Sequence, residues 1–250
     1  MKLEIYRDSF DSDILKRECF KININITGKA SVNKNLENAI AELACADLIC
    51  LVTDHNPDLN NLIVQSGFSI IGTKNVYKLE NFTHVVKKEN ENLKIFSKNW
   101  AAEFLQINDF KRLISTLVVK SRYWKDSLIP KELSFAIYEK WFYNSIYNKY
   151  ADEVFIAING KKPIGILTLK KHKEIAHIDL IVVDPDEKGK GIGNLLLVES
   201  FNYCQQNGIN SLYVETEGEN IEANRFYQRS GFLLTKHSLV FHKHRKKEKN

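Results

Sequence analysis

The sequence is poor in cysteine and has no long apolar run. Its four cysteines, Cys19, Cys45, Cys50 and Cys204, show neither CxxC nor zinc-ligand spacing. We therefore expect reduced thiols, no metal site and a cytoplasmic location. No stretch approaches the roughly 18 apolar residues of a membrane helix, and the first residues lack the apolar core of a signal peptide. These absences predict no insertion into a membrane.

Excess charge is concentrated at the C-terminus. Lys and Arg number 36 against 31 Asp and Glu, which gives a formal net charge of +5. Residues 243–250 hold five bases and one acid and so carry most of this excess. Such a tail is typical of a solvated chain end. The near-neutral remainder predicts no nucleic-acid partner.

A polar stretch, Lys87-Lys88-Glu89-Asn90-Glu91-Asn92, is the best candidate for a linker. It predicts a small N-terminal α/β domain over residues 1–86 and a second domain over residues 93–250, which ends in the basic tail. Apolar periodicity in the first domain predicts helices and strands at 36–46, 48–52, 59–65 and 76–79.

The second domain is expected to start with helices and to continue as a β-rich region. Asn159-Gly160 predicts a hairpin between two strands. The last strand includes Leu239-Val240-Phe241, and as an exposed strand it is free to pair across a homodimer. The helices and strands expected, in order, are 110–119, 131–146, 154–158, 163–169, 176–183, a helix from 195, 211–215, 220–229 and 232–241.

A short sequence repeat occurs in both parts of the chain. Gln65-Ser66-Gly67-Phe68 matches Arg229-Ser230-Gly231-Phe232, and each follows a strand and a short helix and precedes a strand. This predicts that the first domain is a degenerate half of a duplicated unit, without a glycine loop.

The most informative stretch is Lys188-Gly189-Lys190-Gly191-Ile192-Gly193, which lies between a predicted strand and a predicted helix. Glycines at a helix N-terminus leave backbone N–H groups and the helix dipole facing one anion, such as a phosphate or pyrophosphate. The stretch does not match the P-loop pattern. It fits the dinucleotide pattern poorly, because an antiparallel hairpin precedes it.

This stretch resembles the Q/R-x-x-G-x-G/A pyrophosphate motif of the GNAT family of acyl-CoA-dependent N-acyltransferases, with Lys at the first position. The family's second motif, N-x-x-A-x-x-x-Y-x-x-x-G-F, is present with matching spacing as Asn220, Ala223, Tyr227, Gly231 and Phe232. The resemblance covers residues 93–242. It implies an α+β GNAT fold, with a mixed, mostly antiparallel central sheet flanked by helices, and acetyl-CoA or another short acyl-CoA as co-substrate.

The resemblance also implies roles for single residues. Tyr227 stands where the family places the general acid that protonates the leaving thiolate, although a core aromatic is the alternative. The strand before the glycine loop is implied to offer backbone N–H groups to the thioester oxygen. The residues implied to bind CoA are Ile181, Val182, Val183, Lys188, Gly189, Lys190, Gly191, Ile192, Gly193, Asn194 and, on the pantetheine arm, Asn220.

His177 and Asp179 are the candidates for the base. On a regular strand they share one face with Ile181 and Val183. An imidazole has a pKa near roughly 6.5 and suits proton removal at neutral pH, and Asp179 can orient it or hold a substrate ammonium. The alternative is that both side chains only make ordinary hydrogen bonds at a solvated end of the strand. A chain of water molecules would then take the proton from the amine.

The segment Ser121-Arg122-Tyr123-Trp124, with Tyr138-Glu139-Lys140-Trp141 and Ala151-Asp152-Glu153-Val154 further on, resembles a GNAT subgroup that acylates dTDP-linked amino sugars, such as the dTDP-fucosamine acetyltransferases. It implies that Arg122, Tyr123 and Trp124 bind a nucleotide sugar, since Arg pairs with diphosphates and aromatic rings stack on bases. Burial of the aromatic residues in a core is the alternative.

The function predicted from the sequence is transfer of an acetyl or short hydroxyacyl group from CoA to the amine of a dTDP-linked amino-dideoxy sugar. The amine attacks directly in a ternary complex, because no cysteine lies in either motif. Two alternatives stay open. One is a GNAT enzyme that acts on a protein N-terminus, a lysine or a polyamine, and the other is a non-catalytic acyl-CoA-binding module.

Overall fold

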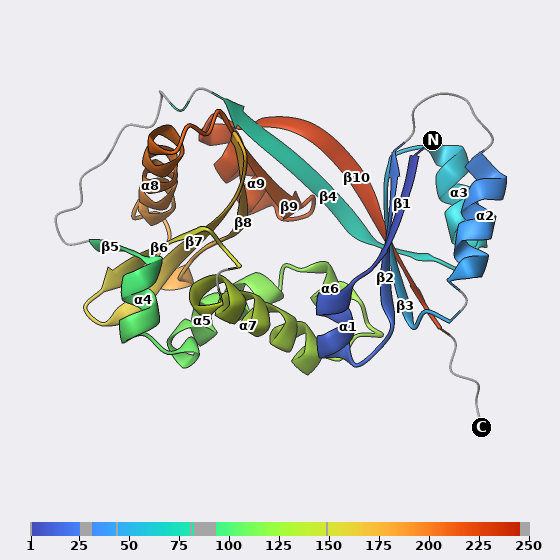
Figure 1. Ribbon diagram of the computed structural model, residues 1–250, viewed down its shortest axis with the longest axis horizontal. Coiled ribbons are helices and arrows are strands. Elements are labelled where there is room, and N and C mark those ends of the chain that lie inside the picture. The colour runs from blue at the N-terminus through green and yellow to red at the C-terminus, as the bar shows by residue number, and fades with distance from the viewer. Residues whose placement is uncertain are drawn as a thin grey trace.

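A single mixed sheet runs through the computed structural model, which describes residues 2–25, 32–43, 45–80, 82, 94–148 and 150–245 (Figure 1). Its ten strands lie in the order β1-β2-β3-β10-β4-β9-β8-β7-β6-β5. The pairs β2–β3 and β8–β9 are parallel and the others are antiparallel. The predicted mixed, mostly antiparallel α+β sheet is confirmed.

The N-terminal half alternates strands and helices. Helix α3 begins where Asn56 accepts a hydrogen bond from the Leu59 N–H at 3.0 Å, with Pro57 at the first helical position. The elements are β1 (Lys2–Arg7), α1 (Ser9–Leu15), β2 (Cys19–Asn25), α2 (Val32–Glu42), β3 (Leu48–Asp54), α3 (Pro57–Gln65) and β4 (Ser69–Glu80).

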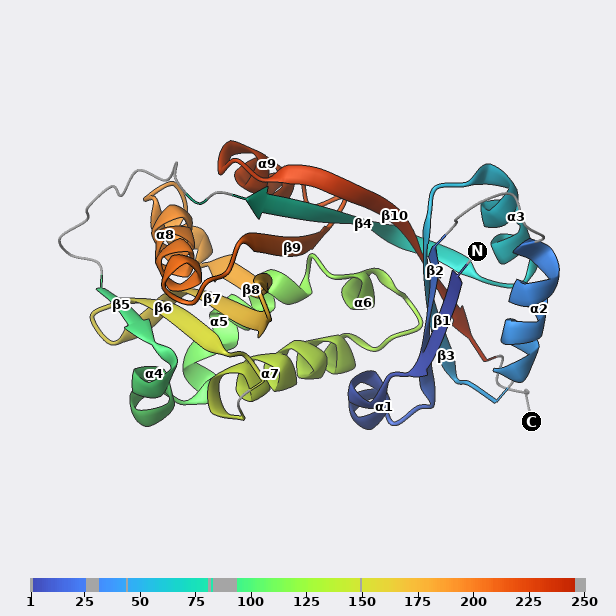
Figure 2. The same cartoon turned by 45° about the horizontal axis from the view of Figure 1, so that its top comes forward.

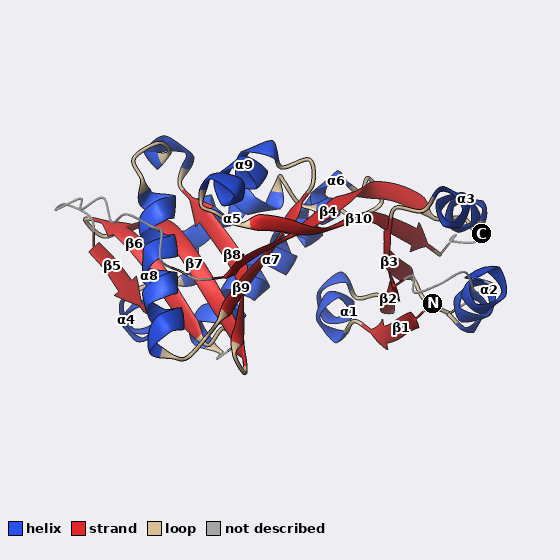
Figure 3. Ribbon diagram, turned by 90° about the horizontal axis from the view of Figure 1, so that it is seen from above, coloured by secondary structure: helices blue, strands red, loops and turns tan. Residues whose placement is uncertain are grey.

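The C-terminal half places α8 on one face of its strands and α5 and α7 on the other (Figure 3). No helix within the described residues has the length and apolarity needed to cross a bilayer. The elements are β5 (Lys94–Ser97), α4 (Lys98–Phe104), η1 (Ile107–Phe110), α5 (Lys111–Val118), α6 (Arg122–Lys125), α7 (Lys131–Tyr147), β6 (Glu153–Asn159), β7 (Lys162–His172), β8 (Ile175–Val183), η2 (Pro185–Glu187), α8 (Ile192–Gln206), β9 (Ser211–Glu217), α9 (Ile221–Arg229) and β10 (Leu233–His244).

The two halves exchange their last strands. Strand β4 pairs with β9 of the C-terminal half, and β10 pairs with β3 of the N-terminal half, while β4 and β10 run side by side (Figure 2). Each strand follows a short helix and a left-handed glycine, Gly67 at φ 86° and Gly231 at φ 87°. This correspondence agrees with the predicted duplication.

The exchange corrects one expectation. Strand β10 lies inside the sheet between β3 and β4, with Val240 and Phe241 buried, so it offers no edge for pairing across a dimer. The linker candidate at residues 87–92 and the tail beyond residue 245 fall outside the described residues. The domain boundary there stays a prediction, and the sheet itself is continuous across both halves.

Because Phe241 is fully buried among N-terminal residues such as Ile22 and Leu51, we expect Phe241→Ala to lower the free energy of unfolding by about 3–5 kcal/mol. The matched control is Leu233→Ala at the exposed start of the same strand, which should change it by less than about 0.5 kcal/mol. Urea denaturation followed by circular dichroism measures both. Similar small losses in the two variants would contradict the exchanged packing.

Candidate active site

The parallel strands β8 and β9 separate about halfway along their length, at a point that we call the split. Their pairing runs from Ile175 opposite Ser211 to Ile178 opposite Val214 and then ends. Strand β8 continues to Val183 on β7, and β9 continues to Glu217 on β4. Beyond the split, the β8 backbone groups that face β9 have no strand partner in the described sheet. Such groups require a hydrogen-bonding partner, which a ligand with amide groups can supply.

A β-bulge in β8 lies at the split. Leu180 pairs with Thr168 and Ile178 with Leu169, so Asp179 between them has no opposite residue on β7. The bulge reverses the alternation of side chains along the strand.

This reversal corrects the expected shared face. Ile178, before the bulge, lies in the same core as Ile181 and Val183 on the α8 side. His177 therefore points to the opposite face from Ile181 and Val183, where its ring stacks on Tyr213 with centroids 5.3 Å apart. A regular strand would have placed His177 with them.

Asp179 is a half-buried acid with one unpaired carboxylate oxygen. Its Oδ2 atom is buried and has no hydrogen-bond partner among the described residues. Burial raises the pKa of Asp179 to about 7; Lys170 opposes this shift, and the charges of Glu215 and Asp152 add to it. Burial also lowers the pKa of His177. Asp179 can therefore accept a proton near neutral pH, whereas burial makes His177 a weaker base than a free imidazole.

The glycine stretch forms an open turn between η2 and α8. Gly189 and Gly191 have φ values of 79° and 81°, in the left-handed region that favours glycine, and a Cβ built on either meets nothing within 4 Å. Gly191 precedes α8 without any side-chain cap on the helix. Gly193 instead lies against Phe226, whose ring is 3.2 Å from such a Cβ. The turn and the first helical N–H groups are thus open to an anion.

Buried Asp184 anchors this turn, a role that the sequence analysis missed. Its carboxylate accepts hydrogen bonds from Arg112 and Lys162, both at 2.8 Å, and from the Asp186 N–H at 3.1 Å. Burial opposes the ionised form of Asp184, but these contacts outweigh it and lower its pKa. The predicted Lys188 pairs with Glu222 at 2.7 Å.

The remaining predicted CoA-binding side chains lie around the turn. Lys190 pairs with Glu187 at 2.7 Å, Ile192 is buried, and Asn194 is exposed in the first turn of α8. Asn220 accepts from the Ala223 N–H at 3.4 Å and so caps α9. The structure therefore gathers these residues at one end of α8 and α9.

Tyr227 lies in the core beside the split. It is 3% exposed, and its ring is 5.7 Å from that of Tyr77 and from that of Phe232. Burial first, and then Tyr77, raise the pKa of Tyr227 well above its ordinary value. The packing agrees with the core-aromatic alternative, and the hydroxyl stays protonated at neutral pH.

Asn224, which the sequence analysis also missed, connects α9 to strand β4. It accepts hydrogen bonds from Asn75 at 2.7 Å and from Tyr77 at 2.8 Å, and it donates to the Glu217 carbonyl at 3.1 Å. These bonds fix the turn between β9 and α9.

Residues 119–232 match the Acetyltransferase (GNAT) family. Solved structures of similar fold include a GCN5-related N-acetyltransferase from Sphaerobacter thermophilus, with a TM-score of 0.59 at 12% identity over 99% of this chain and 78% of that one. A tandem GNAT protein from the clavulanic acid biosynthesis pathway has a TM-score of 0.57 at 11% identity over 92% of this chain and 76% of that one. The chain has the GNAT fold.

Relatives by sequence differ in what they are named for. The chain is 29% identical over 100 residues to an uncharacterised N-acetyltransferase of Methanocaldococcus jannaschii, over 37% of this chain and 44% of that one. It is 27% identical to N-alpha-acetyltransferase 30 of Schizosaccharomyces pombe, over 50% of this chain and 87% of that one. It is 26% identical to the spore coat polysaccharide biosynthesis protein SpsD of Bacillus subtilis, over 49% of this chain and 42% of that one. The first and third matches thus span less than half of those relatives.

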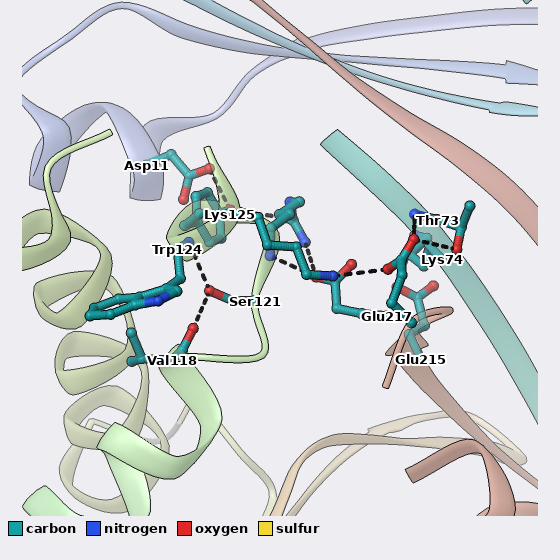
Figure 4. Close-up of polar contacts among 12 residues, drawn as sticks. Asp11, Thr73, Lys74, Val118, Ser121, Trp124, Lys125, Glu215 and Glu217 are labelled. Carbon is teal, nitrogen blue, oxygen red and sulfur yellow. Dashed lines mark hydrogen bonds and ion pairs between the residues drawn. The ribbon is translucent and has the colours of Figure 1, made fainter. Parts of the chain in front are cut away.

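Within this GNAT fold, α6 carries the segment predicted to bind a nucleotide sugar (Figure 4). The Tyr123 hydroxyl donates to Asp11 at 2.7 Å and accepts from Arg122 at 2.8 Å. Tyr123 is 4% exposed, so its ring has no face free for a nucleobase. Trp124 is partly buried against the α5–α7 core. For Tyr123, the structure agrees with the core alternative.

Three acids on and after β9 neutralise the bases beside the split (Figure 4). Lys74 pairs with Glu215 at 2.9 Å and Lys125 with Glu219 at 2.9 Å. The Arg122 N–H donates to Glu217 at 3.1 Å, and its guanidinium lies 4.0 Å from the same carboxylate. The sequence analysis singled out Arg122 but not these acids, which occupy alternate positions at Glu215, Glu217 and Glu219. We call Arg122, Lys125, Glu217 and Glu219 the charged rim.

We expect Asp179→Asn to stabilise the protein at high pH. A folded-state pKa near 7, against an ordinary 3.8, means that the folded state binds the proton more tightly. The wild type therefore loses stability as pH rises from about 4 to 7, and the variant does not. Allowing for solvent screening, the gain at pH 8 should be on the order of 1 kcal/mol and should vanish near pH 4.

Thermal unfolding across this pH range measures the effect. Exposed Asp13→Asn serves as the control and should show no such pH-dependent gain. Destabilisation of Asp179→Asn at pH 8 would contradict the uncompensated burial of the carboxylate.

Proposed function

We propose that the protein is an acyl-CoA-dependent N-acyltransferase. The observation that carries this proposal is the split between β8 and β9, which leads directly into the open glycine turn at α8. Strand-edge backbone groups suit the amides of pantetheine, and the turn suits its pyrophosphate. The relatives and the matched family, which are named as acetyltransferases, support the same activity.

In this proposal CoA lies along β8. Backbone groups of Ile181, Val182 and Val183 bind the pantetheine arm and the thioester oxygen, and Asn220 contributes its side-chain amide. The turn from Lys188 to Gly193 holds the pyrophosphate, with Asn194 at its end. Fixed backbone donors stabilise the developing oxyanion without reorganisation.

The reaction is direct attack of a neutral amine on the thioester carbonyl. The C–N bond forms, the C–S bond breaks, and CoA leaves as a thiolate. The Tyr227 hydroxyl donates a hydrogen bond to the sulfur. Full proton transfer is uphill, because the pKa of Tyr227 lies far above the roughly 8.5 of a thiol, so solvent protonates the thiolate last.

Asp179 is the better candidate for the group that takes the amine proton. Its free Oδ2 and its pKa near 7 make it an acceptor at neutral pH. His177, stacked on Tyr213 on the face away from Ile181, serves as a positioning residue for the acceptor.

The acceptor in this proposal is a dTDP-linked amino sugar. The likeness to SpsD, whose name places it in polysaccharide biosynthesis, supports a sugar. Arg122 and Lys125 of the charged rim would exchange their carboxylate partners for the diphosphate, because both ligands bind guanidinium and ammonium groups in the same way.

A cationic acceptor, such as a protein N-terminus, a lysine or a polyamine, is the second candidate. Glu217 and Glu219 of the charged rim favour it, because they place negative charge beside the bases. The likeness to N-alpha-acetyltransferase 30 points the same way.

Release of free thiol from acetyl-CoA, measured over a panel of amines, tests the function. We expect turnover with dTDP-amino sugars and little with peptides or polyamines. Lys125→Gln should raise the KM for a dTDP-sugar about tenfold, whereas Glu219→Gln, its ion-pair partner, should lower it or leave it unchanged. The opposite signs would select the cationic acceptor. If no amine gave turnover while the protein still bound CoA, the result would contradict the proposed enzyme activity and favour a binding module.

We expect Gly191→Ala to weaken CoA binding about tenfold or more. The residue has a left-handed φ, and the added Cβ meets only the space assigned to the pyrophosphate. Gly160→Ala is the matched control, because Gly160 also has a positive φ and an open Cβ position but lies in the β6–β7 hairpin. Both variants carry the backbone cost of about 1–2 kcal/mol. Calorimetric titration with CoA should separate them, and equal affinities would contradict the site.

A further inference from the structure

Two histidines and an aspartate meet in the joint between the two halves of the molecule. His242 and His244 project from the same face of β10, because they are two positions apart on a strand. Asp126 follows α6 directly. Its Oδ2 atom lies 2.7 Å from His242 Nδ1 and 2.7 Å from His244 Nε2. All three ligand atoms lie within 4.8 Å of one another.

The cluster is enclosed. The side chains of His242, Asp126 and His244 are 0%, 3% and 12% exposed. His242 Nε2 is buried and has no hydrogen-bond partner among the described residues. Cys50 lies directly opposite His242 in the β3–β10 register, so both side chains face the same side of the sheet. A proton on this nitrogen would leave Nδ1, the atom that faces Asp126, with the free lone pair that a metal ion requires.

We propose that Asp126, His242 and His244 bind one divalent transition-metal ion, best met by Zn²⁺. Two imidazoles and one carboxylate are a common zinc ligand set with the fourth position left to water, whereas Mg²⁺ and Ca²⁺ require oxygen ligands. The ion would lie between Asp126 Oδ2 and the two ring nitrogens that now face it, so these two nitrogens would carry no proton in the bound state. With Nδ1 bound to the ion, the single proton of neutral His242 would lie on Nε2, and the sulfur of the opposite residue Cys50 could accept it as the outer partner that metal-bound histidines use.

The metal would connect the end of α6 to strand β10, which carries both histidines. Arg122, in the same short helix, belongs to the charged rim beside the split. An ion on Asp126 would therefore fix the position of the helix that carries the two bases of this rim. The sequence analysis expected no metal, because it considered only the spacing of the cysteines. Asp126 and His242 are 116 residues apart in the sequence, and no ligand of this cluster is a cysteine.

Zinc uptake by the untagged, full-length protein tests the proposal. After treatment with a chelator, the protein is dialysed against Zn²⁺ and its metal content is measured by mass spectrometry. We expect about one ion per chain in the wild type and loss of uptake in His244→Asn, whose side chain is partly exposed and whose fold circular dichroism verifies. His172→Asn, at an exposed histidine at the end of β7, should keep wild-type uptake.

Cobalt gives a readout that needs no variant. Co²⁺ bound to the wild type should show the visible bands of a four-coordinate site, and Zn²⁺ should abolish them and raise the melting temperature. No zinc above the His244→Asn level, or a cobalt spectrum like that of the free aqueous ion, would overturn the proposal. Both assays are independent of acyl-CoA, so their failure is separable from failure of the proposed enzyme activity.

Discussion

The parting of β8 from β9 is the constraint on which the candidate active site depends. Each strand is held by a different neighbour beyond the split: β8 by β7 as far as Val183, and β9 by β4 as far as Glu217. The backbone of β8 cannot satisfy its hydrogen bonds on both sides. A polar, strand-like ligand edge is the natural partner for the side left open.

The N-terminal half supplies part of this constraint. Strand β4, which diverts β9, comes from that half, and its Asn75 and Tyr77 bind Asn224 at the start of α9. In return, β10 completes the N-terminal sheet through Phe241. The N-terminal half therefore acts as a structural support of the site.

The sequence predicted the parts of the site that depend on local backbone chemistry. Glycines at 189 and 191, between a strand and a helix, indicated an anion site, and both adopt the left-handed conformation that glycine favours. The order of helices and strands, together with the two motifs that resemble those of the GNAT family, predicted the fold class. The matching Ser-Gly-Phe segments indicated the repeat, but not that the halves exchange their last strands, because pairing partners depend on the tertiary arrangement.

What the sequence did not predict arises from contacts between distant segments. The bulge at Asp179 has no local signal and reverses the face on which His177 lies. Tyr123 was predicted to stack on a base, yet Leu15 and Leu48 from the other half of the chain share its buried cluster, and Asp11 accepts a hydrogen bond from its hydroxyl. The acids that neutralise Arg122 and Lys125 lie about 95 residues further on. Such pairings are visible only once the strands are placed.

A crystal structure of the protein with CoA tests the central claim most directly. We expect the pantetheine arm to hydrogen-bond with the β8 backbone at Ile181, Val182 and Val183. Its pyrophosphate should lie on the turn from Lys188 to Gly193, and its sulfur should lie beside Tyr227. CoA bound elsewhere, or a β8 edge that closes onto β9 instead of receiving the ligand, would contradict this account.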